Sequence, residues 1–157
     1  MVDRQNIFRQ PWSKRSLIAL LPVIGSLSTG CGDGRPTRVP VSGRVVIDGQ
    51  PLERGNIRFY PASNRPASAA LGPGGRFSLT TYELNDGCVP GKHPVSVSGT
   101  ELINNTTQRW YAPKKYAQPS TSGLEFVVTD ETDEANIDLT WAGGKPFDER
   151  IIGGGSE

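Results

Sequence analysis

The chain has 157 residues, with 17 Lys and Arg against 16 Asp and Glu, and a formal net charge of +1. Residues 1–30 carry four of the basic residues and one of the acidic ones, so residues 31–157 hold 13 basic against 15 acidic side chains, a net charge of −2. A chain this close to neutral lacks the basic surface that binds nucleic acid, so we expect no nucleic-acid partner. Residues 31–157 have the length of one domain.

The first 30 residues have the composition of a secretory signal peptide. Four basic residues outnumber a single acidic one in the first 15 positions. The uncharged, mostly apolar run Ser16–Leu27 follows, and its 12 residues are too few for a membrane-spanning helix, which needs about 20. Small residues come next. A basic start, a short apolar centre and a small-residue end predict that residues 1–30 are a signal peptide and that the protein is exported.

The segment Leu27–Cys31, with the sequence LSTGC, resembles the lipobox of bacterial lipoproteins, with its leucine one position earlier than that family's usual one. The resemblance implies that the Cys31 thiol takes a diacylglyceryl group and becomes the N-terminus after cleavage. Each buried CH₂ contributes about 0.8 kcal/mol, so two or more acyl chains would hold the protein on a membrane, on the periplasmic side or in the outer membrane. Residues 31–37 would be a tether. The alternative is an exported protein cut near Gly30, whose Cys31 could pair with Cys88.

Short segments with strand patterns predict an all-β domain over residues 38–140. Val39–Pro61 predicts two strands joined by a short loop around Asp48-Gly49, because β-branched and aromatic residues flank that turn. Further strands are expected at Ala70-Leu71, Arg76–Thr81, Lys92–Ser98, Leu124–Thr129 and Ala135–Leu139. No segment after residue 30 has a sustained helical period, and turn signals recur every 8–12 residues or so. This spacing is typical of a β-sandwich of about seven strands.

The segments between these strands give more specific expectations. Pro61–Ala70 is predicted to be a loop, Asp130–Glu134 an acidic turn, and residues 141–157 a mobile tail. Pro94 lacks a backbone N–H, so it should hold its strand to a sheet edge or mark the first residues of that strand. The predicted core consists of Val45, Ile47, Ile57, Phe59, Phe77, Leu79, Val95, Val97, Phe126, Val128, Ile137 and Leu139.

Several longer pieces of the chain together resemble one family. They read GCGDG, VSGRVVIDGQPLERGNIRFYP, GGRFSLTTYELNDG, PGKHPVSVSG and APKKYAQPSTSGLEFVVT, and they cover most of Cys31–Leu139. In content and order they are similar to small lipoproteins of planctomycete bacteria that carry a carboxypeptidase regulatory-like, transthyretin-like domain. His93 stands where those proteins more often have an aromatic residue. The resemblance implies an immunoglobulin-like β-sandwich and no assigned catalytic residues.

Few residues have the chemistry of an active site or a metal site. His93 is the one histidine of the chain, which is too few for the histidine-dependent sites of some transthyretin-like enzymes. A Cys88–His93 pair and a calcium site at the acidic residues of Asp130–Glu134 are the weaker alternatives. We therefore expect a non-enzymatic protein without metal or cofactor. A thiol-dependent enzyme at Cys88 is the distant alternative.

The 25-residue segment Gly99–Gly123 is predicted to be a long irregular loop, and loops of this length are usually functional or disordered. Its aromatic and basic residues form the candidate binding surface: Trp110, Tyr111, Lys114, Lys115 and Tyr116. We expect Trp110 and Tyr116 to be at least half buried and the two lysines to face solvent. The predicted role is structural or protein-binding, in contact with envelope proteins or glycans. The main alternative is a carbohydrate-binding module that uses the Trp110–Tyr116 loop.

Overall fold

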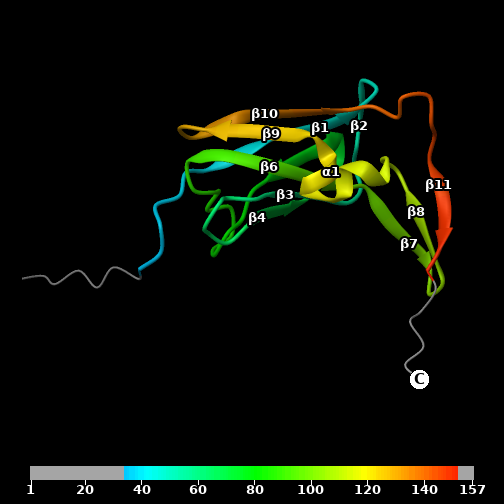
Figure 1. Ribbon diagram of the computed structural model, residues 1–157, viewed down its shortest axis with the longest axis horizontal. Helices are drawn as coiled ribbons and strands as arrows, with labels where there is room; N and C mark the ends of the chain where they lie inside the picture. The colour runs from blue at the N-terminus through cyan, green and yellow to red at the C-terminus, as the bar shows by residue number, and fades with distance from the viewer. Residues whose placement is uncertain (1–33, 152–157) are drawn as a thin grey trace, which may run out of the picture. The chain divides into compact units, whose positions relative to one another are not determined.

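The computed structural model describes residues 34–151, so the predicted signal peptide and Cys31 lie outside the described residues. The described part is built mainly from antiparallel sheets, with only three short helical turns (Figure 1). The prediction of an all-β chain is confirmed at this level. No helix in this part of the chain is both long enough and apolar enough to cross a membrane.

The first sheet is centred on β1, the strand Val41–Ile47. On one side β1 pairs in parallel with β10, and on the other it pairs antiparallel with β5 near its start and with β2 near its end. The partner strands are β2 (Gln50–Pro51), β5 (Arg76–Ser78) and β10 (Thr132–Leu139). The turn between β1 and β2 has positive φ at Asp48 and Gly49, as the favoured two-residue hairpin turn requires.

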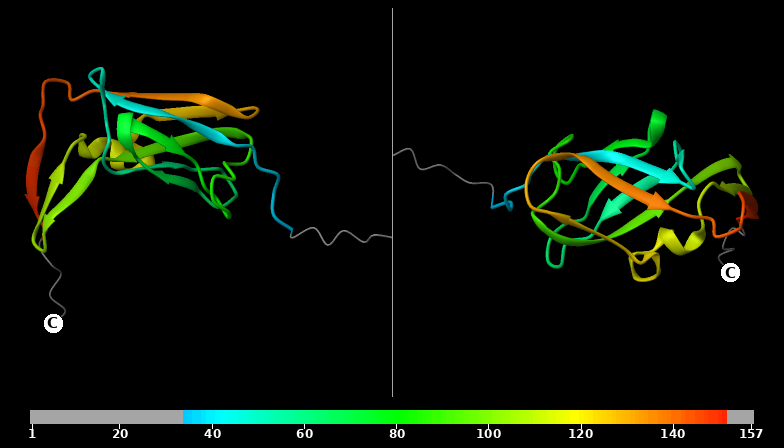
Figure 2. Two further views of the ribbon diagram at one scale, coloured as in Figure 1. Left: turned by 180° about the vertical axis from the view of Figure 1, so that it is seen from behind. Right: turned by 90° about the horizontal axis from the view of Figure 1, so that it is seen from above.

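The second sheet has the strand order β4-β3-β6-β9, and all its pairings are antiparallel. Its strands are β3 (Asn56–Phe59), β4 (Ala67–Ala70), β6 (Gly91–Ser98) and β9 (Leu124–Val128). Side chains of both sheets enter one buried cluster, and the rings of Phe59 and Phe77, one from each sheet, lie 6.4 Å apart. We call these two sheets the two-sheet body (Figure 2).

A third sheet, called the outer sheet below, lies at one end of the two-sheet body (Figure 1). It has the order β11-β8-β7 and is antiparallel throughout. Its strands are β7 (Thr100–Asn104), β8 (Thr107–Trp110) and β11 (Phe147–Arg150). The helical turns are η1 (Pro73–Gly75), η2 (Lys114–Ala117) and α1 (Pro119–Ser122), and the last two join the outer sheet to β9.

The predicted core is confirmed with one exception. All of its side chains are buried except Phe126, which is partly buried and packs against the cluster. Phe126 lies in the edge strand β9, opposite His93 of β6. Val45, Val46 and Ile47 are all apolar, so their sequence alone does not determine the inward face, and the structure buries Val45 and Ile47.

Several predicted boundaries are wrong. Residues 34–151 form eleven strands, where about seven were expected over the domain. Three expected loops or turns contain strand residues: Ala67–Ala70 is β4, Gly99–Gly123 contains β7 and β8, and β10 begins inside the acidic turn, at Thr132. In the segment predicted to be a mobile tail, residues 147–150 form β11 and pair with β8. These segments are polar or rich in small residues, so their strand conformation depends on pairing with partner strands more than on their own composition.

The placement of Pro94 also differs from the expectation. Its strand β6 lies between β3 and β9, not at an edge, and Pro94 is well inside that strand. Phe59, the last residue of β3, pairs with Val95, and the next backbone contact is a hydrogen bond from the Tyr60 N–H to the Pro94 carbonyl at 2.9 Å. The missing N–H of Pro94 therefore falls where pairing with β3 ends, so an interior strand tolerates it.

Candidate functional site

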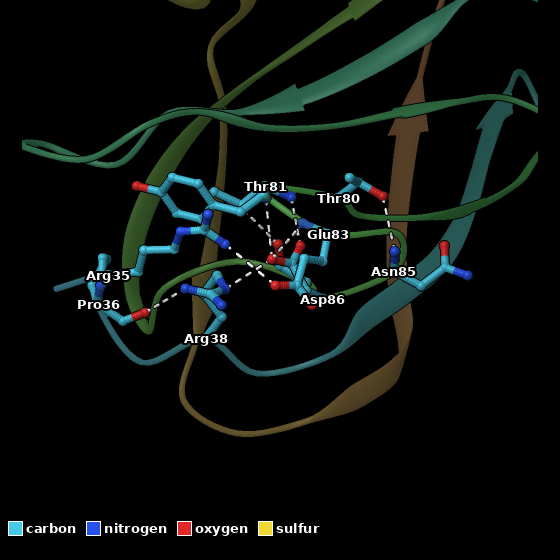
Figure 3. A network of polar contacts seen from close by, with 10 residues as sticks. Arg35, Pro36, Arg38, Thr80, Thr81, Glu83, Asn85 and Asp86 are labelled. Atoms are coloured by element: carbon cyan, nitrogen blue, oxygen red, sulfur yellow. Dashed lines mark hydrogen bonds and ion pairs between the residues drawn. The ribbon is translucent and has the colours of Figure 1, made fainter. Parts of the chain in front are cut away.

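Residues 35–38, which follow Cys31 closely in the sequence, contact the two-sheet body. Arg35 forms an ion pair with Glu83 at 3.3 Å, and its guanidinium lies 5.0 Å from the centre of the Tyr82 ring. Arg38 lies over the same ring at 4.9 Å and donates to the Pro36 carbonyl at 2.8 Å (Figure 3). The last residues of the predicted tether therefore contact the connection between β5 and β6.

Asp86 organises that connection. Its Oδ1 accepts a hydrogen bond from the Thr81 N–H at 2.7 Å, and its Oδ2 accepts from the N–H groups of Tyr82 and Glu83 at 3.1 and 3.0 Å (Figure 3). The Arg38 Nε lies 2.8 Å from the same Oδ2, and the Asp86 side chain is only 13% exposed. One carboxylate thus closes the turn and binds the incoming chain.

The electrostatics of Asp86 favour its charged form. Burial raises the pKa of this carboxyl, but the hydrogen bonds from three backbone N–H groups and the charge of Arg38 outweigh burial, so the pKa lies below its usual value. The next residue, Gly87, has a φ of 79°, and a Cβ there would lie 1.8 Å from the Val39 carbonyl oxygen. Asn85, Asp86 and Gly87 are residue types that favour turns, but nothing in the sequence indicated that this turn binds residues 35–38.

The aromatic rings of the predicted binding surface are mostly buried. Trp110 is 8% exposed and Tyr116 is 5% exposed, which confirms that both are at least half buried. Trp110 stacks on Phe147 of β11 with 6.2 Å between ring centres, and its Nε1–H donates to Glu149 at 2.8 Å. Tyr116 belongs to the main core, and its hydroxyl accepts from the Thr140 N–H at 3.2 Å.

The two lysines of this surface are exposed, as expected. Lys114 forms an ion pair with Glu149 and lies 5.4 Å from the centre of the Trp110 ring. Hydrogen bonds from Lys114, Gln108 and Trp110, in that order of effect, lower the pKa of Glu149 to about 2. Tyr111, which is partly buried, donates to Glu101 at 2.8 Å. Most polar groups of the surface are therefore already paired within the protein.

A polar groove of about 400 Å³ lies between the second sheet, the outer sheet and the short helical turns. This volume is within the usual range for small-molecule sites. It is lined by Asn56, Arg58, Tyr60, Ser96, Ser98, Thr100, Gln108, Trp110, Ala117 and Gln118. Of the predicted surface residues, only Trp110 lines it. Sequence reasoning missed the groove because its walls combine β3 with the later strands β6, β7 and β8, which the sequence alone does not bring together.

Cys88 and His93 do not form a catalytic pair. Cys88 is 1% exposed, and burial raises the pKa of its thiol to about 11. A thiol with this pKa stays protonated near neutral pH and is a poor nucleophile. His93 is also buried: its Nε2 is 2.9 Å from the Val89 carbonyl oxygen, and its Nδ1 has no hydrogen-bond partner.

The acidic residues of Asp130–Glu134 do not gather around a common centre. Among residues 34–151, no group of three or more His, Cys, Asp or Glu side chains is arranged to hold a metal ion. Comparisons with protein-family models, with curated proteins and with solved structures found no match to this chain. The candidate sites are therefore judged from their own geometry.

Proposed function

We propose that this protein is a non-enzymatic, lipid-anchored module of the bacterial cell envelope, with a structural or protein-binding role. The observation that carries the proposal is the order of features before Cys31: a basic start, a short apolar run and small residues. Arg35 and Arg38, which follow Cys31 closely in the sequence, contact the connection between β5 and β6, and this supports it. A lipid on Cys31 would then hold the two-sheet body close to the membrane surface.

The finer fold that we propose is an immunoglobulin-like, transthyretin-like β-sandwich, as in the planctomycete lipoproteins that the sequence resembles. Two facing sheets with a shared core support this assignment. The non-enzymatic role is supported by the burial of Cys88 and by the separate hydrogen bonding of His93. Partners in the envelope would contact side chains at the surface of the two sheets and of the outer sheet.

The anchor is tested by the intact mass of the protein extracted from bacterial membranes. We expect the loss of residues 1–30 and the added mass of a diacylglyceryl group on Cys31. The Cys31→Ala variant should leave the membrane fraction, whereas Cys88→Ala should stay in it because its thiol is buried. An unlipidated wild-type protein, or a Cys31→Ala variant that remains fully membrane-bound, would contradict the proposal.

A second candidate function, carbohydrate binding, is favoured by the polar groove. Trp110 lines this groove together with amide and hydroxyl side chains, the groups that usually contact sugars. The candidate site therefore moves from the Trp110–Tyr116 loop to the groove beside it. Glycan arrays probed with the full chain test it: binding that is lost on Gln108→Ala would support it, and an array without any binding would exclude it.

A further inference from the structure

The outer face of the second sheet carries one arginine between two serines. In the register of the sheet, Arg58 of β3 lies opposite Ser68 of β4 on one side and Ser96 of β6 on the other. Arg58 is exposed, while Ser96 is only 4% exposed, and the Ser96 Oγ lies 3.1 Å from the Tyr60 hydroxyl. A carboxylate opposite a cation on a sheet face would stabilise the sheet, but the cross-strand neighbours of Arg58 are hydroxyl groups.

Arg58 also connects the polar groove to a second hollow. That hollow, of about 270 Å³, is lined by Arg58, Tyr60, Arg65, Pro66, Ser68, Thr80 and Thr81. Because Arg58 and Tyr60 line both hollows, the two adjoin at these side chains, and we call them together the extended groove. A chain of linked polar units would fit such a shape better than a single compact ligand.

The charged side chains that line this extended groove are all positive. Arg58 and Arg65 are the charged side chains that line it, and no Asp or Glu is among its described lining residues. Arg58 forms no ion pair within residues 34–151, and Arg65 lies 5.7 Å from the centre of the Tyr82 ring. Arg54 and Arg109, by contrast, are neutralised by Glu101 and Asp148. A groove lined by charge of a single sign attracts ligands of the opposite sign.

The other lining groups favour a polyhydroxylated ligand. The amides of Asn56, Gln108 and Gln118 can each donate and accept hydrogen bonds, as can the hydroxyls of Ser98 and Thr100. Sugar hydroxyls also need both donors and acceptors. Arginine binds carboxylate and sulfate groups through two parallel hydrogen bonds.

We infer that the groove binds an acidic saccharide. Arg58 would bind the carboxylate or sulfate of one sugar unit, and the amide and serine side chains would bind the hydroxyl groups of the neighbouring units. This inference rests on the carbohydrate-binding candidate above and specifies its ligand class. It needs no catalytic group and no metal, because the ligand is held by its charge and its hydroxyl pattern.

The test compares charged and neutral saccharides on the full chain purified in detergent. The probes are oligomers of galacturonic acid, oligomers of alginate, sulfated chondroitin fragments, neutral dextran oligomers of matched length and inorganic sulfate, with affinity measured by calorimetry. We expect at least one acidic series to bind about tenfold or more tightly than dextran. Arg58→Gln should abolish this preference, whereas Arg44→Gln, an exposed arginine on β1 of the first sheet, should leave it unchanged.

Each other outcome overturns the inference in a different way. Equal binding of dextran and acidic oligomers would keep carbohydrate binding but remove the acidic ligand class. Binding of inorganic sulfate without any saccharide would show a simple anion site. Acidic binding that survives Arg58→Gln would place the site elsewhere. No binding by any probe would exclude the inference alone, while the glycan array would still decide the carbohydrate candidate and the intact mass the lipid anchor.

Discussion

The two-sheet body and the outer sheet are stabilised by different interactions. In the body, Ile57, Phe59 and Val95 are fully buried among apolar side chains. In the outer sheet, Trp110 is the buried apolar side chain, and strands are joined by contacts between β8 and β11 such as the Arg109–Asp148 ion pair and the hydrogen bond from Gln108 to Glu149. Burial of a large apolar side chain contributes more to folding stability than an exposed ion pair, which contributes about 0–1 kcal/mol.

This difference means that the two regions should respond to different perturbations. Removing a buried ring should destabilise the whole body, since a core cavity affects every strand around it. Changing the charge state of the outer sheet should loosen that sheet and leave the body folded. Since the outer sheet also forms one wall of the polar groove, its stability bears on ligand binding.

The largest effect is expected from Phe59→Ala. The Phe59 ring is fully buried and lies within 6.4 Å of three other rings, those of Phe77, His93 and Phe126. Its removal should lower the free energy of unfolding by about 3–5 kcal/mol, as measured by denaturant titration. The control Val127→Ala removes a side chain that is 58% exposed and should cost less than about 0.5 kcal/mol. A cost below about 1 kcal/mol for Phe59→Ala would mean that the ring is not enclosed.

Asp86→Ala should have the next largest effect. It removes the acceptor of three backbone N–H groups and the partner of Arg38, so we expect a loss of about 2 kcal/mol in the free energy of unfolding. Glu83→Ala is the matched control in the same turn, since the Glu83 side chain is 72% exposed and pairs only with Arg35 among the described contacts. Equal losses in both variants would show that Asp86 does not organise the turn.

Phe147→Ala should affect the outer sheet without unfolding the body. It removes the ring that stacks on Trp110, so the indole Nε1–H of Trp110 should exchange with solvent at least several times faster in NMR spectra. The midpoint of global unfolding should change little, because Phe147 lies outside the core and is 38% exposed. Leu102→Ala, a change of another exposed side chain in the same sheet, should leave the indole exchange unaltered. Unfolding of the outer sheet and the two-sheet body in a single step would contradict their separate stabilisation.

The smallest effect is expected from acid. The pKa of Glu149 is lowered from 4.5 to about 2 in the folded protein, so between these values the unfolded chain binds the extra proton. The contribution of Glu149 to stability is therefore complete above about pH 4.5 and is lost as the pH falls through about 2. Protection of the Trp110 indole should fall in the same range, and Glu149→Gln should remove this pH dependence. A transition near pH 4.5 would show that Glu149 is not stabilised by Lys114 in solution.

The same contrast explains how much the sequence could predict. In the body, Ile57 and Phe59 alternate with polar residues, and so do Phe77 and Leu79, so their buried face follows from the chain itself. In β7 the apolar residues Leu102 and Ile103 are adjacent and both exposed, which hides the strand period. The four residues of β11 read FDER, and only their pairing with β8 makes them a strand.

The candidate sites divide in a similar way. The turn at Asn85-Asp86-Gly87 could be predicted because its residue types favour turns. The burial of Trp110 could be predicted because Trp110 lies in a segment of the sequence that is rich in aromatic residues. The polar groove could not be predicted, since Arg58, Ser96 and Gln108 come together only through the register of β3 with β6 and the position of the outer sheet. Side chains far apart in the sequence leave no local pattern.

Native-state hydrogen exchange on the full chain is the most direct test of the difference between the two regions. We expect the amides of β1, β3 and β6 to exchange only through global unfolding, with a denaturant dependence equal to that of the whole protein. The amides of β7, β8 and β11 should exchange through a smaller opening with a lower free energy, and Phe147→Ala should lower it further. Equal exchange free energies in the two-sheet body and the outer sheet would contradict their independent stabilisation.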